Sequence, residues 1–299
     1  MIFIIIAIIV VVVLFLITSL FIASNAVHGR RQTMDESWVW QQDHAPGSRA
    51  FQKTDLEDYT VTGPDGYLYH VSCLSAQADS DRYVILAHGY TDTRYGMMKY
   101  APLYHELGFH CVMFDERGHG ENAPVPCSYG IREVEGLLAV LDDTRKRFGP
   151  DIRIGFHGES LGGATVLTAL KYHPEIHFVV DDCGFAAIVP ILKRVLKNYG
   201  IPGFMVYPAT LVSSILYKVN FLKARPIDAV VGNQIPLLIM HGADDDFILP
   251  ENSARIKDAT AGYATLHFFP EAGHALSAII DPDRYLVLLR EFFTEIHFL

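Results

Sequence analysis

Positive charge is scarce in this chain. Its 24 Lys and Arg residues are outnumbered by 34 Asp and Glu residues, and the formal net charge is −10 at pH 7. Nucleic-acid binding needs clusters of Lys and Arg that neutralise phosphates, so this composition excludes nucleic acid as an expected partner. Low-complexity tracts and internal repeats are absent as well. With 299 residues, 50% of them hydrophobic, the chain is long enough for one large domain with a sizeable core.

Cysteine is scarce too, and it follows no metal-binding pattern. The four cysteines are scattered, with neither Cys-x-x-Cys pairs nor zinc spacing. Three of them lie in or beside apolar segments, so we expect buried free thiols, which neither require nor exclude an oxidising compartment. No motif implies a metal or an organic cofactor. The four positions are Cys73, Cys111, Cys127 and Cys183.

Charged residues are missing from the N-terminus, where one long hydrophobic run stands. Between residues 2 and 23 only Thr18 and Ser19 are polar. A helix over this stretch would be about 33 Å long, enough to cross the hydrocarbon core of a bilayer. A secretory signal peptide usually has a basic residue before its apolar run, and none occurs here, so we predict an uncleaved single-pass anchor over residues 1–24. A cleaved signal sequence and a buried core helix are the alternatives.

The residues after the run bear on its orientation. Arg30 and Arg31 follow directly, and by the positive-inside rule they place the rest of the chain in the cytoplasm. Residues 25–50 are mixed in composition, and we expect a juxtamembrane connector there, with Trp38 and Trp40 at the membrane interface. The sequence thus predicts a membrane-bound protein whose main domain lies on the cytoplasmic side.

From residue 51 onward, short apolar runs alternate with helical patterns. Apolar strands separated by helices are typical of a mostly parallel sheet covered on both faces. We therefore predict an α/β domain over residues 51–299. The expected strands are 67–74, 83–87, 109–114, 153–156, 178–180, 237–240 and 265–269, and the expected helices are 130–148, 161–172, 253–260 and 285–298.

The alternation breaks between residues 180 and 237. Two helical stretches, 186–198 and 209–218, follow one another there without a strand between them. Long insertions commonly cover active sites, so we predict a small helical lid at about 186–232. The alternative is an elongated crossover helix.

The pentapeptide Gly-Glu-Ser-Leu-Gly at residues 158–162 stands between a predicted strand and a predicted helix. This is the setting of the Gly-x-Ser-x-Gly nucleophile elbow, in which a tight turn lifts the serine above the sheet edge. Glycines flank that serine because side chains would block the close approach of helix to strand. We therefore predict Ser160 as a nucleophile. An ordinary strand–helix turn fits the pentapeptide alone equally well, so the remaining catalytic groups decide between the two.

A serine nucleophile needs a base and an acid that orients the base, and here they are expected to follow the serine in the order acid, then histidine. The run at 237–240 leads into three consecutive aspartates, Asp244 to Asp246, at the carboxyl edge of the sheet. Spacing favours Asp245 as the acid, and Asp244 and Asp246 are the alternatives. His274 lies on the loop after the last predicted strand and is the predicted base.

The developing oxyanion needs two backbone N–H groups. The first is predicted at Leu161, directly after the nucleophile and at a helix N-terminus. The second is predicted at Tyr90, on the glycine-containing loop that follows the strand at 83–87. An ordinary strand-ending turn is the alternative for this loop. Two further histidines, His88 and His157, lie in or at the ends of strands, where we expect structural roles.

With these residues in order, nearly all of residues 51–299 resemble the α/β-hydrolase superfamily. Four motifs carry the resemblance: a His-Gly-x oxyanion loop at 88–90, an Asp-x-Arg-Gly-x-Gly turn at 115–120, the elbow at 158–163 and a His-Gly-x-x-Asp acid loop at 241–245. Within the superfamily, the chain is similar to the lysophospholipase-like and serine aminopeptidase-like hydrolases. It departs from the family pattern at Asn122, where a serine is usual, and at Pro250, which comes one residue late.

The resemblance implies a serine hydrolase with an acyl-enzyme intermediate. Together with the predicted anchor, it predicts a membrane-bound enzyme that cleaves esters, thioesters or amides of a small, lipid-like acyl substrate. Ser160 would attack the carbonyl carbon, His274 would move the proton, and Asp245 would orient His274. Acyl transfer or aminopeptidase activity is the alternative among enzymes, and a non-catalytic binding protein of the same fold is the alternative outside them.

Overall fold

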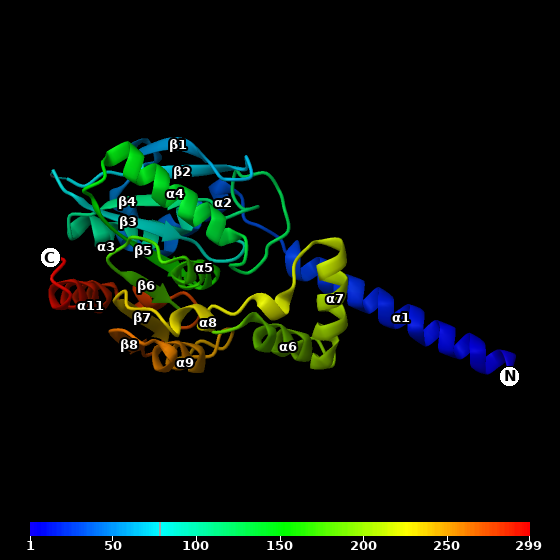
Figure 1. Ribbon diagram of the computed structural model, residues 1–299. Helices are drawn as coiled ribbons and strands as arrows, with labels where there is room; N and C mark the ends of the chain where they lie inside the picture. The colour runs from blue at the N-terminus through cyan, green and yellow to red at the C-terminus, as the bar shows by residue number, and fades with distance from the viewer. Residues whose placement is uncertain (78) are drawn as a thin grey trace.

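Eight strands form one sheet in the computed structural model, which describes residues 1–77 and 79–299 (Figure 1). The strand order is β1-β2-β4-β3-β5-β6-β7-β8. Strands β3 to β8 are parallel to one another, and β2 pairs antiparallel with both β1 and β4. The predicted mostly parallel sheet is therefore confirmed. The strands are β1 (Leu56–Thr62), β2 (Leu68–Leu74), β3 (Arg82–Ala87), β4 (His110–Phe114), β5 (Arg153–Glu159), β6 (Val179–Asp182), β7 (Leu237–Gly242) and β8 (Ala264–Phe269).

Both faces of the sheet are covered by helices, as its apolar strands require. In β3, Val84 and Leu86 pack toward one face and Ile85 toward the other, because side chains alternate along a strand. The carboxyl ends of the parallel strands meet at one edge, where loops that are distant in sequence come together. The first face is covered by α3 (Ala101–Glu106), α10 (Ser277–Ile280) and α11 (Pro282–Glu295), and the second by α4 (Glu133–Phe148), α5 (Leu161–Ala169) and α9 (Glu251–Ala259).

All seven predicted strands are present, and the structure adds β1 at the edge of the sheet. Strand β1 was not predicted because its sequence is mostly polar, and only Leu56 and Val61 are buried in it. An edge strand pairs on one side and exposes most of its side chains, so it needs no continuous apolar run. The predicted helices are present, with their ends shifted by a few residues.

The N-terminal run forms one helix, α1 (Ile2–Val27), that projects from the domain (Figure 1). Its most apolar 18-residue window has a mean hydropathy of 3.4, and 6% of that window is buried. This length and composition suffice to cross a membrane. The C-terminal end of α1 is different, because Ile22, Ala23 and Val27 are buried and the helix packs there against α7 (Val206–Leu216).

The residues after α1 fold onto the domain. Helix α2 (Met34–His44) begins at a capping box, in which the side chains of Thr33 and Glu36 each accept a backbone N–H of the other residue. The ring of Trp38 packs edge-on against that of Tyr95, with 5.1 Å between their centroids. The expected connector therefore contains a helix that is docked on the domain.

Every residue between β6 and β7 is described, and none of them forms a strand, as the sequence predicted. Residues 186–232, which we call the insertion, form α6 (Ile188–Asn198), α7 and α8 (Ile227–Val230) with short 3-10 turns between them. Residues of α6 and α7, among them Leu196 and Val206, share a small apolar cluster with the end of α1. The insertion and the N-terminal helix are therefore packed together.

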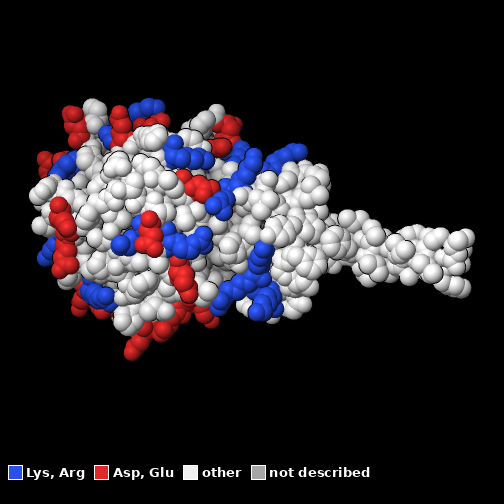
Figure 2. Space-filling view, turned by 60° about the horizontal axis from the view of Figure 1, so that its bottom comes forward, with Lys and Arg blue, Asp and Glu red and all other residues white. Residues whose placement is uncertain are grey.

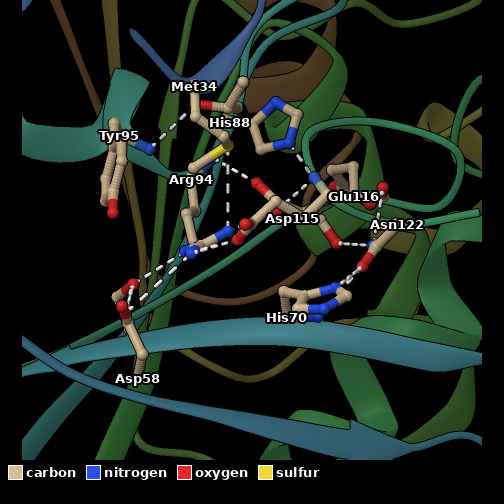
Figure 3. Close-up of polar contacts among 12 residues, drawn as sticks. Met34, Asp58, His70, His88, Arg94, Tyr95, Asp115, Glu116 and Asn122 are labelled. Atoms are coloured by element: carbon tan, nitrogen blue, oxygen red, sulfur yellow. Dashed lines mark hydrogen bonds and ion pairs between the residues drawn. The ribbon is translucent and has the colours of Figure 1, made fainter. Parts of the chain in front are cut away.

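A buried ion pair joins the turn after β4 to the segment after β3 (Figure 3). The Arg94 guanidinium, 3% exposed, lies 2.6 Å from the fully buried carboxylate of Asp115 and 2.6 Å from the carboxylate of Glu121. The backbone N–H of Arg94 also donates to Asp115 at 2.7 Å. Arg94 opens the 3-10 helix η3 (Arg94–Lys99), so the carboxylate of Asp115 ties this helix to the Asp-x-Arg-Gly-x-Gly turn.

Asn122, which stands where the family pattern has a serine, completes this network (Figure 3). Its side-chain N–H donates to the Asp115 carbonyl at 2.7 Å, and its oxygen accepts the His70 backbone N–H at 2.9 Å. The neighbouring Glu116 N–H donates to His88 Nε2 at 2.9 Å. His88 thus holds the loop after β3 against the turn after β4, which is a structural role.

Removal of the Arg94 cation should destabilise the fold strongly. The variant Arg94→Met leaves the Asp115 carboxylate buried without its partner, and such losses cost about 3–5 kcal/mol. We expect the free energy of unfolding to fall by this order in denaturant titrations of the detergent-solubilised chain. Arg290→Met is the control, because Arg290 is 57% exposed in its pair with Glu106 and its loss should change stability little. Equal effects of the two variants would contradict this role of Arg94.

Candidate active site

The backbone at Ser160 is strained in the way that a nucleophile elbow requires. Ser160 has φ 54° and ψ −107°, a conformation that residues with side chains rarely adopt. A Cβ on Gly158 would lie 2.1 Å from the Gly162 carbonyl oxygen, and a Cβ on Gly162 would lie 1.9 Å from that of Ala87. Only glycine permits these approaches between α5 and strands β5 and β3. The elbow therefore depends on both glycines of its motif.

Three predicted residues from three loops meet at the carboxyl edge of the sheet. His274 Nε2 lies 3.0 Å from Ser160 Oγ, and His274 Nδ1 lies 2.7 Å from Asp245 Oδ2. The residues follow β5, β7 and β8, so parallel pairing brings them together although Ser160 and His274 are 114 positions apart. When the Nδ1 proton of His274 is donated to Asp245, the Nε2 lone pair faces the serine hydroxyl. This is the orientation that a general base needs.

The structure distinguishes among the three consecutive aspartates. Asp245 is 2% exposed, and its carboxylate contacts His274. Asp244 and Asp246 are both exposed to solvent. Of the alternatives that the sequence left open, the geometry therefore favours Asp245.

Four donors hold the Asp245 carboxylate in place. Oδ1 accepts the backbone N–H groups of Phe247 and Ile248, each at 2.9 Å, and Oδ2 accepts from His241 and His274. Burial by itself raises the pKa of a carboxyl group. Here the hydrogen bonds from the two histidines outweigh burial and lower the pKa of Asp245 below its ordinary value. The carboxylate is therefore charged at neutral pH.

His241 supports the site in a way that its sequence motif did not reveal. Its Nε2 lies 2.8 Å from the Ile248 carbonyl oxygen and 3.1 Å from Asp245 Oδ2. Because a carbonyl oxygen only accepts, Nε2 carries a proton and shares it with Asp245. The other ring nitrogen, Nδ1, lies 2.6 Å from Ser253 Oγ, so both ring nitrogens have polar partners. His241 thus helps to hold the Asp245 carboxylate that contacts His274.

The two predicted oxyanion donors lie beside the nucleophile. A Cβ on Gly89 would be 3.6 Å from the Ser160 Cβ, so the loop that carries Tyr90 passes alongside the elbow. Among the hydrogen bonds of the described residues, the backbone N–H groups of Tyr90 and Leu161 have no acceptor. Free donors beside a nucleophile can stabilise negative charge on a carbonyl oxygen.

A buried ion pair next to Ser160 was missed by the sequence analysis. Lys99 Nζ lies 2.5 Å from Glu159 Oε2 and donates to the Ala275 carbonyl at 3.2 Å. Glu159 directly precedes Ser160 and Ala275 directly follows His274, so Lys99 ties the two loops together. Burial alone would lower the pKa of Lys99, but the adjacent Glu159 charge raises it above its ordinary value. No local pattern marks Lys99, because its partners are remote in sequence.

One group at the site could offer three metal ligands. The donor atoms of Cys183, Asp245 and His274 lie within 4.8 Å of one another. However, Asp245 and His274 are hydrogen-bonded to each other, and burial raises the pKa of the Cys183 thiol well above its ordinary value. A neutral thiol is a poor ligand, since metals bind the thiolate. The chemistry of this group therefore suits proton transfer better than metal binding.

An apolar pocket of about 630 Å³ opens beside Ser160. Its walls come from the end of α1, the loop after β3, helix α6 and the loop after β7. Phe21 and Ile22 of α1 and Ile188 and Ile191 of α6 line this space, and none of the described residues that line it is charged. The sequence predicted a lid near the serine, but it did not indicate that α1 reaches the pocket.

A family model described as the alpha/beta hydrolase family matches residues 84–287. The uncharacterized protein YqkD of Bacillus subtilis is 26% identical over 250 residues, which cover 81% of this chain and 81% of that protein. The uncharacterized protein Rv2307c of Mycobacterium tuberculosis is 26% identical over 249 residues, or 80% of this chain and 79% of that protein.

Solved structures of esterases share the fold. The esterase Pf2001 of Pyrococcus furiosus superposes with a TM-score of 0.66 at 22% identity, covering 84% of this chain and 93% of that chain. The esterase EaEST of Exiguobacterium antarcticum superposes with a TM-score of 0.60 at 17% identity, covering 80% of this chain and 100% of that chain. At such low identity these likenesses concern the arrangement of helices and strands.

Replacement of Lys99 by a neutral residue should destabilise the edge of the sheet that carries Ser160. The variant Lys99→Met leaves Glu159 buried without its cation, at a cost of about 3–5 kcal/mol. We expect a clearly lower unfolding midpoint in thermal melts. Lys53→Met is the matched control, because the Lys53–Asp35 pair is exposed and contributes little. A melting curve of Lys99→Met that overlays that of Lys53→Met would argue against a buried ion pair.

Proposed function

The chain belongs to the alpha/beta hydrolase family, and on that premise we propose that it is a serine hydrolase of carboxylic esters, thioesters or amides. The observation that carries this proposal is the continuous contact from Ser160 Oγ to His274 at 3.0 Å and from His274 to Asp245 at 2.7 Å. Nucleophile, base and orienting acid are all within hydrogen-bond reach, as acyl transfer through a serine requires.

In the proposed reaction, Ser160 Oγ attacks the acyl carbonyl carbon while His274 Nε2 takes the hydroxyl proton. The charged Asp245 stabilises the imidazolium that forms, because its carboxylate accepts the Nδ1 proton throughout. The N–H groups of Tyr90 and Leu161 receive the oxyanion of the tetrahedral intermediate. His274 then gives its proton to the leaving group, and an acyl-enzyme remains.

The second half of the reaction repeats these steps with water. His274 removes a proton from a water molecule, which attacks the acyl carbon, and Ser160 leaves with that proton. The strained backbone at Ser160 supports this role, since strain of this kind is kept where it presents a reactive group. No step needs an organic cofactor.

We further propose that α1 anchors the enzyme in a membrane by a single span. The proposed layout is an anchor at 1–24, a connector at 25–50 and a hydrolase domain at 51–299 whose insertion at 186–232 acts as a lid. The length and hydropathy of α1 support the anchor. Arg30 and Arg31 support a cytoplasmic domain through the positive-inside rule.

The nucleophile can be tested with a fluorophosphonate probe, which modifies activated serines covalently. We expect the native chain to be labelled and Ser160→Ala to lose labelling completely, because no other group replaces the activated hydroxyl. Ser75→Ala is the control, since Ser75 is an exposed serine away from the pocket, and it should label like the native chain. Full labelling of Ser160→Ala, or none of the native chain, would overturn the proposal.

The acid can be identified by three matched amide substitutions. Asp245→Asn should lower kcat for p-nitrophenyl acetate by roughly 10⁴-fold, because an amide in that place favours the wrong tautomer of His274. Asp244→Asn and Asp246→Asn should leave kcat nearly unchanged, since both side chains point into solvent. A large loss in either neighbour, with normal activity of Asp245→Asn, would reassign the acid.

A further inference from the structure

Resting on the proposed hydrolase, we propose a specific substrate class and a second role for α1. The pocket beside Ser160 takes the hydrocarbon chain of a long-chain acyl ester that resides in the membrane. The C-terminal end of α1 forms one wall of this acyl-chain site. The helix is then part of the substrate site as well as an anchor.

The end of α1 is bonded directly to the active-site loop. The Ala26 carbonyl accepts the hydroxyl groups of Tyr90 and Tyr129, at 3.1 Å and 2.5 Å, and the Gly29 N–H donates to the Tyr90 hydroxyl at 2.9 Å. Tyr90 also carries one of the proposed oxyanion donors. The position of α1 is therefore fixed relative to the nucleophile, and its pocket-lining residues are held in place.

The pocket suits a hydrocarbon chain and disfavours a charged ligand. Its volume lies within the range of small-molecule sites, and its lining is uncharged. Of the polar groups in the walls, the hydroxyls of Tyr90 and Tyr129 are bonded to α1, and Asn25 Nδ2 donates to the Phe21 carbonyl at 2.8 Å. Apolar surface therefore dominates what a ligand meets, and each buried methylene of a ligand gains affinity.

The pocket lies where α1 leaves the bilayer. From Ile2 to Phe21 an α-helix rises about 29 Å, which is close to the thickness of a hydrocarbon core of about 30 Å. Phe21 and Ile22, which line the pocket, therefore stand at the boundary between hydrocarbon and headgroups. An acyl chain can move from the bilayer along α1 into the pocket without crossing open water.

The insertion carries the charge and surface that a bilayer would meet. Against the chain's net charge of −10, the insertion has one acidic residue and six basic ones, a pattern that attracts anionic lipid headgroups. Figure 2 shows Lys and Arg near the base of the projecting helix, whereas Asp and Glu lie mainly over the rest of the domain. The basic residues are Lys193, Arg194, Lys197, Lys218, Lys223 and Arg225.

Large apolar side chains are exposed on the same insertion. Leu211 is 63% exposed and Ile215 59% exposed on α7, which packs against α1, and Phe204 and Tyr199 are exposed nearby. Apolar residues beside lysines are typical of helices that lie in a membrane interface. Because this surface continues from the membrane helix itself, the bilayer is the occupant that fits it.

The proposed reaction on such a substrate is hydrolysis of the ester bond. Ser160 Oγ bonds to the acyl carbon, the C–O bond to the alcohol breaks, and the alcohol leaves with the proton that His274 took from Ser160. Water then releases the free fatty acid and restores Ser160.

The test measures chain-length preference in the full chain. With acetyl, butyryl, octanoyl and palmitoyl p-nitrophenyl esters, kcat/KM should rise with length by up to roughly fourfold per methylene, until the pocket is filled. Ile22→Trp narrows the pocket from the α1 side and should lower the ratio of octanoyl to acetyl kcat/KM by roughly fifteenfold, equivalent to the burial of about two methylenes. Ile17→Trp is the control, because Ile17 is 58% exposed on α1 outside the pocket. Its ratio of octanoyl to acetyl kcat/KM should equal that of the native chain.

A second variant keeps the test valid if Ile22→Trp fails to fold. Ile191→Trp narrows the opposite wall on α6 and should lower the same ratio, and melting temperatures show which variants are folded. Two results would refute the acyl-chain site while the hydrolase proposal stands, provided that the native chain labels with the probe and cleaves acetyl esters. One is that kcat/KM of the native chain does not rise with chain length. The other is that both tryptophan variants are folded and have the same octanoyl-to-acetyl ratio as the native chain. Loss of all labelling in the native chain would refute the hydrolase instead.

The source of the acyl chain is tested in vesicles. The full chain, reconstituted in phosphatidylcholine with phosphatidylglycerol, should hydrolyse a palmitoyl lysophospholipid in the same bilayer faster than palmitoyl-coenzyme A in solution. Equal or faster turnover of the soluble thioester would overturn the membrane source.

Discussion

The close approach of α5 to strands β3 and β5 at the elbow is the contact on which the rest of the site depends. It requires glycine at two positions, and it leaves Ser160 with a positive φ that costs free energy. Cooperative pairing in the parallel sheet and the apolar packing on its two faces supply the stability that holds this strained turn. The strain has a use, because it lifts the hydroxyl clear of the sheet and leaves the Leu161 N–H free beside it.

Buried charges hold the loops around that turn. Lys99 links the residue before Ser160 with the residue after His274, and Arg94 links η3 with the turn after β4. Buried pairs of this kind contribute little net stability over apolar packing, but removal of one partner is strongly destabilising because the other charge stays buried. They therefore fix the relative positions of loops that have no regular structure of their own, and the distances from Ser160 to His274 to Asp245 depend on those positions.

Much of this architecture could be predicted from residue patterns. Seven strands were recognisable because buried parallel strands are continuous apolar runs. Ser160 and His274 could be named as candidates because their motifs lie at strand ends in a fixed order. Strand β1 and helix α2 could not be predicted in the same way. The first is a polar edge strand. The second buries Ser37 and Gln41 and packs Trp38 against Tyr95, and these partners lie elsewhere in the chain.

The sequence by itself determined the order of the proposed catalytic residues and the composition of α1, because both are local: a motif at a strand end, and an apolar run long enough for a bilayer. Only the tertiary structure decided which of three adjacent aspartates meets His274, since that depends on which side chain the loop after β7 turns inward. It also decided that the end of α1 lies against Tyr90 and α6. Hydropathy measures how apolar a helix is, but what the helix packs against is set by contacts with residues far away in the chain.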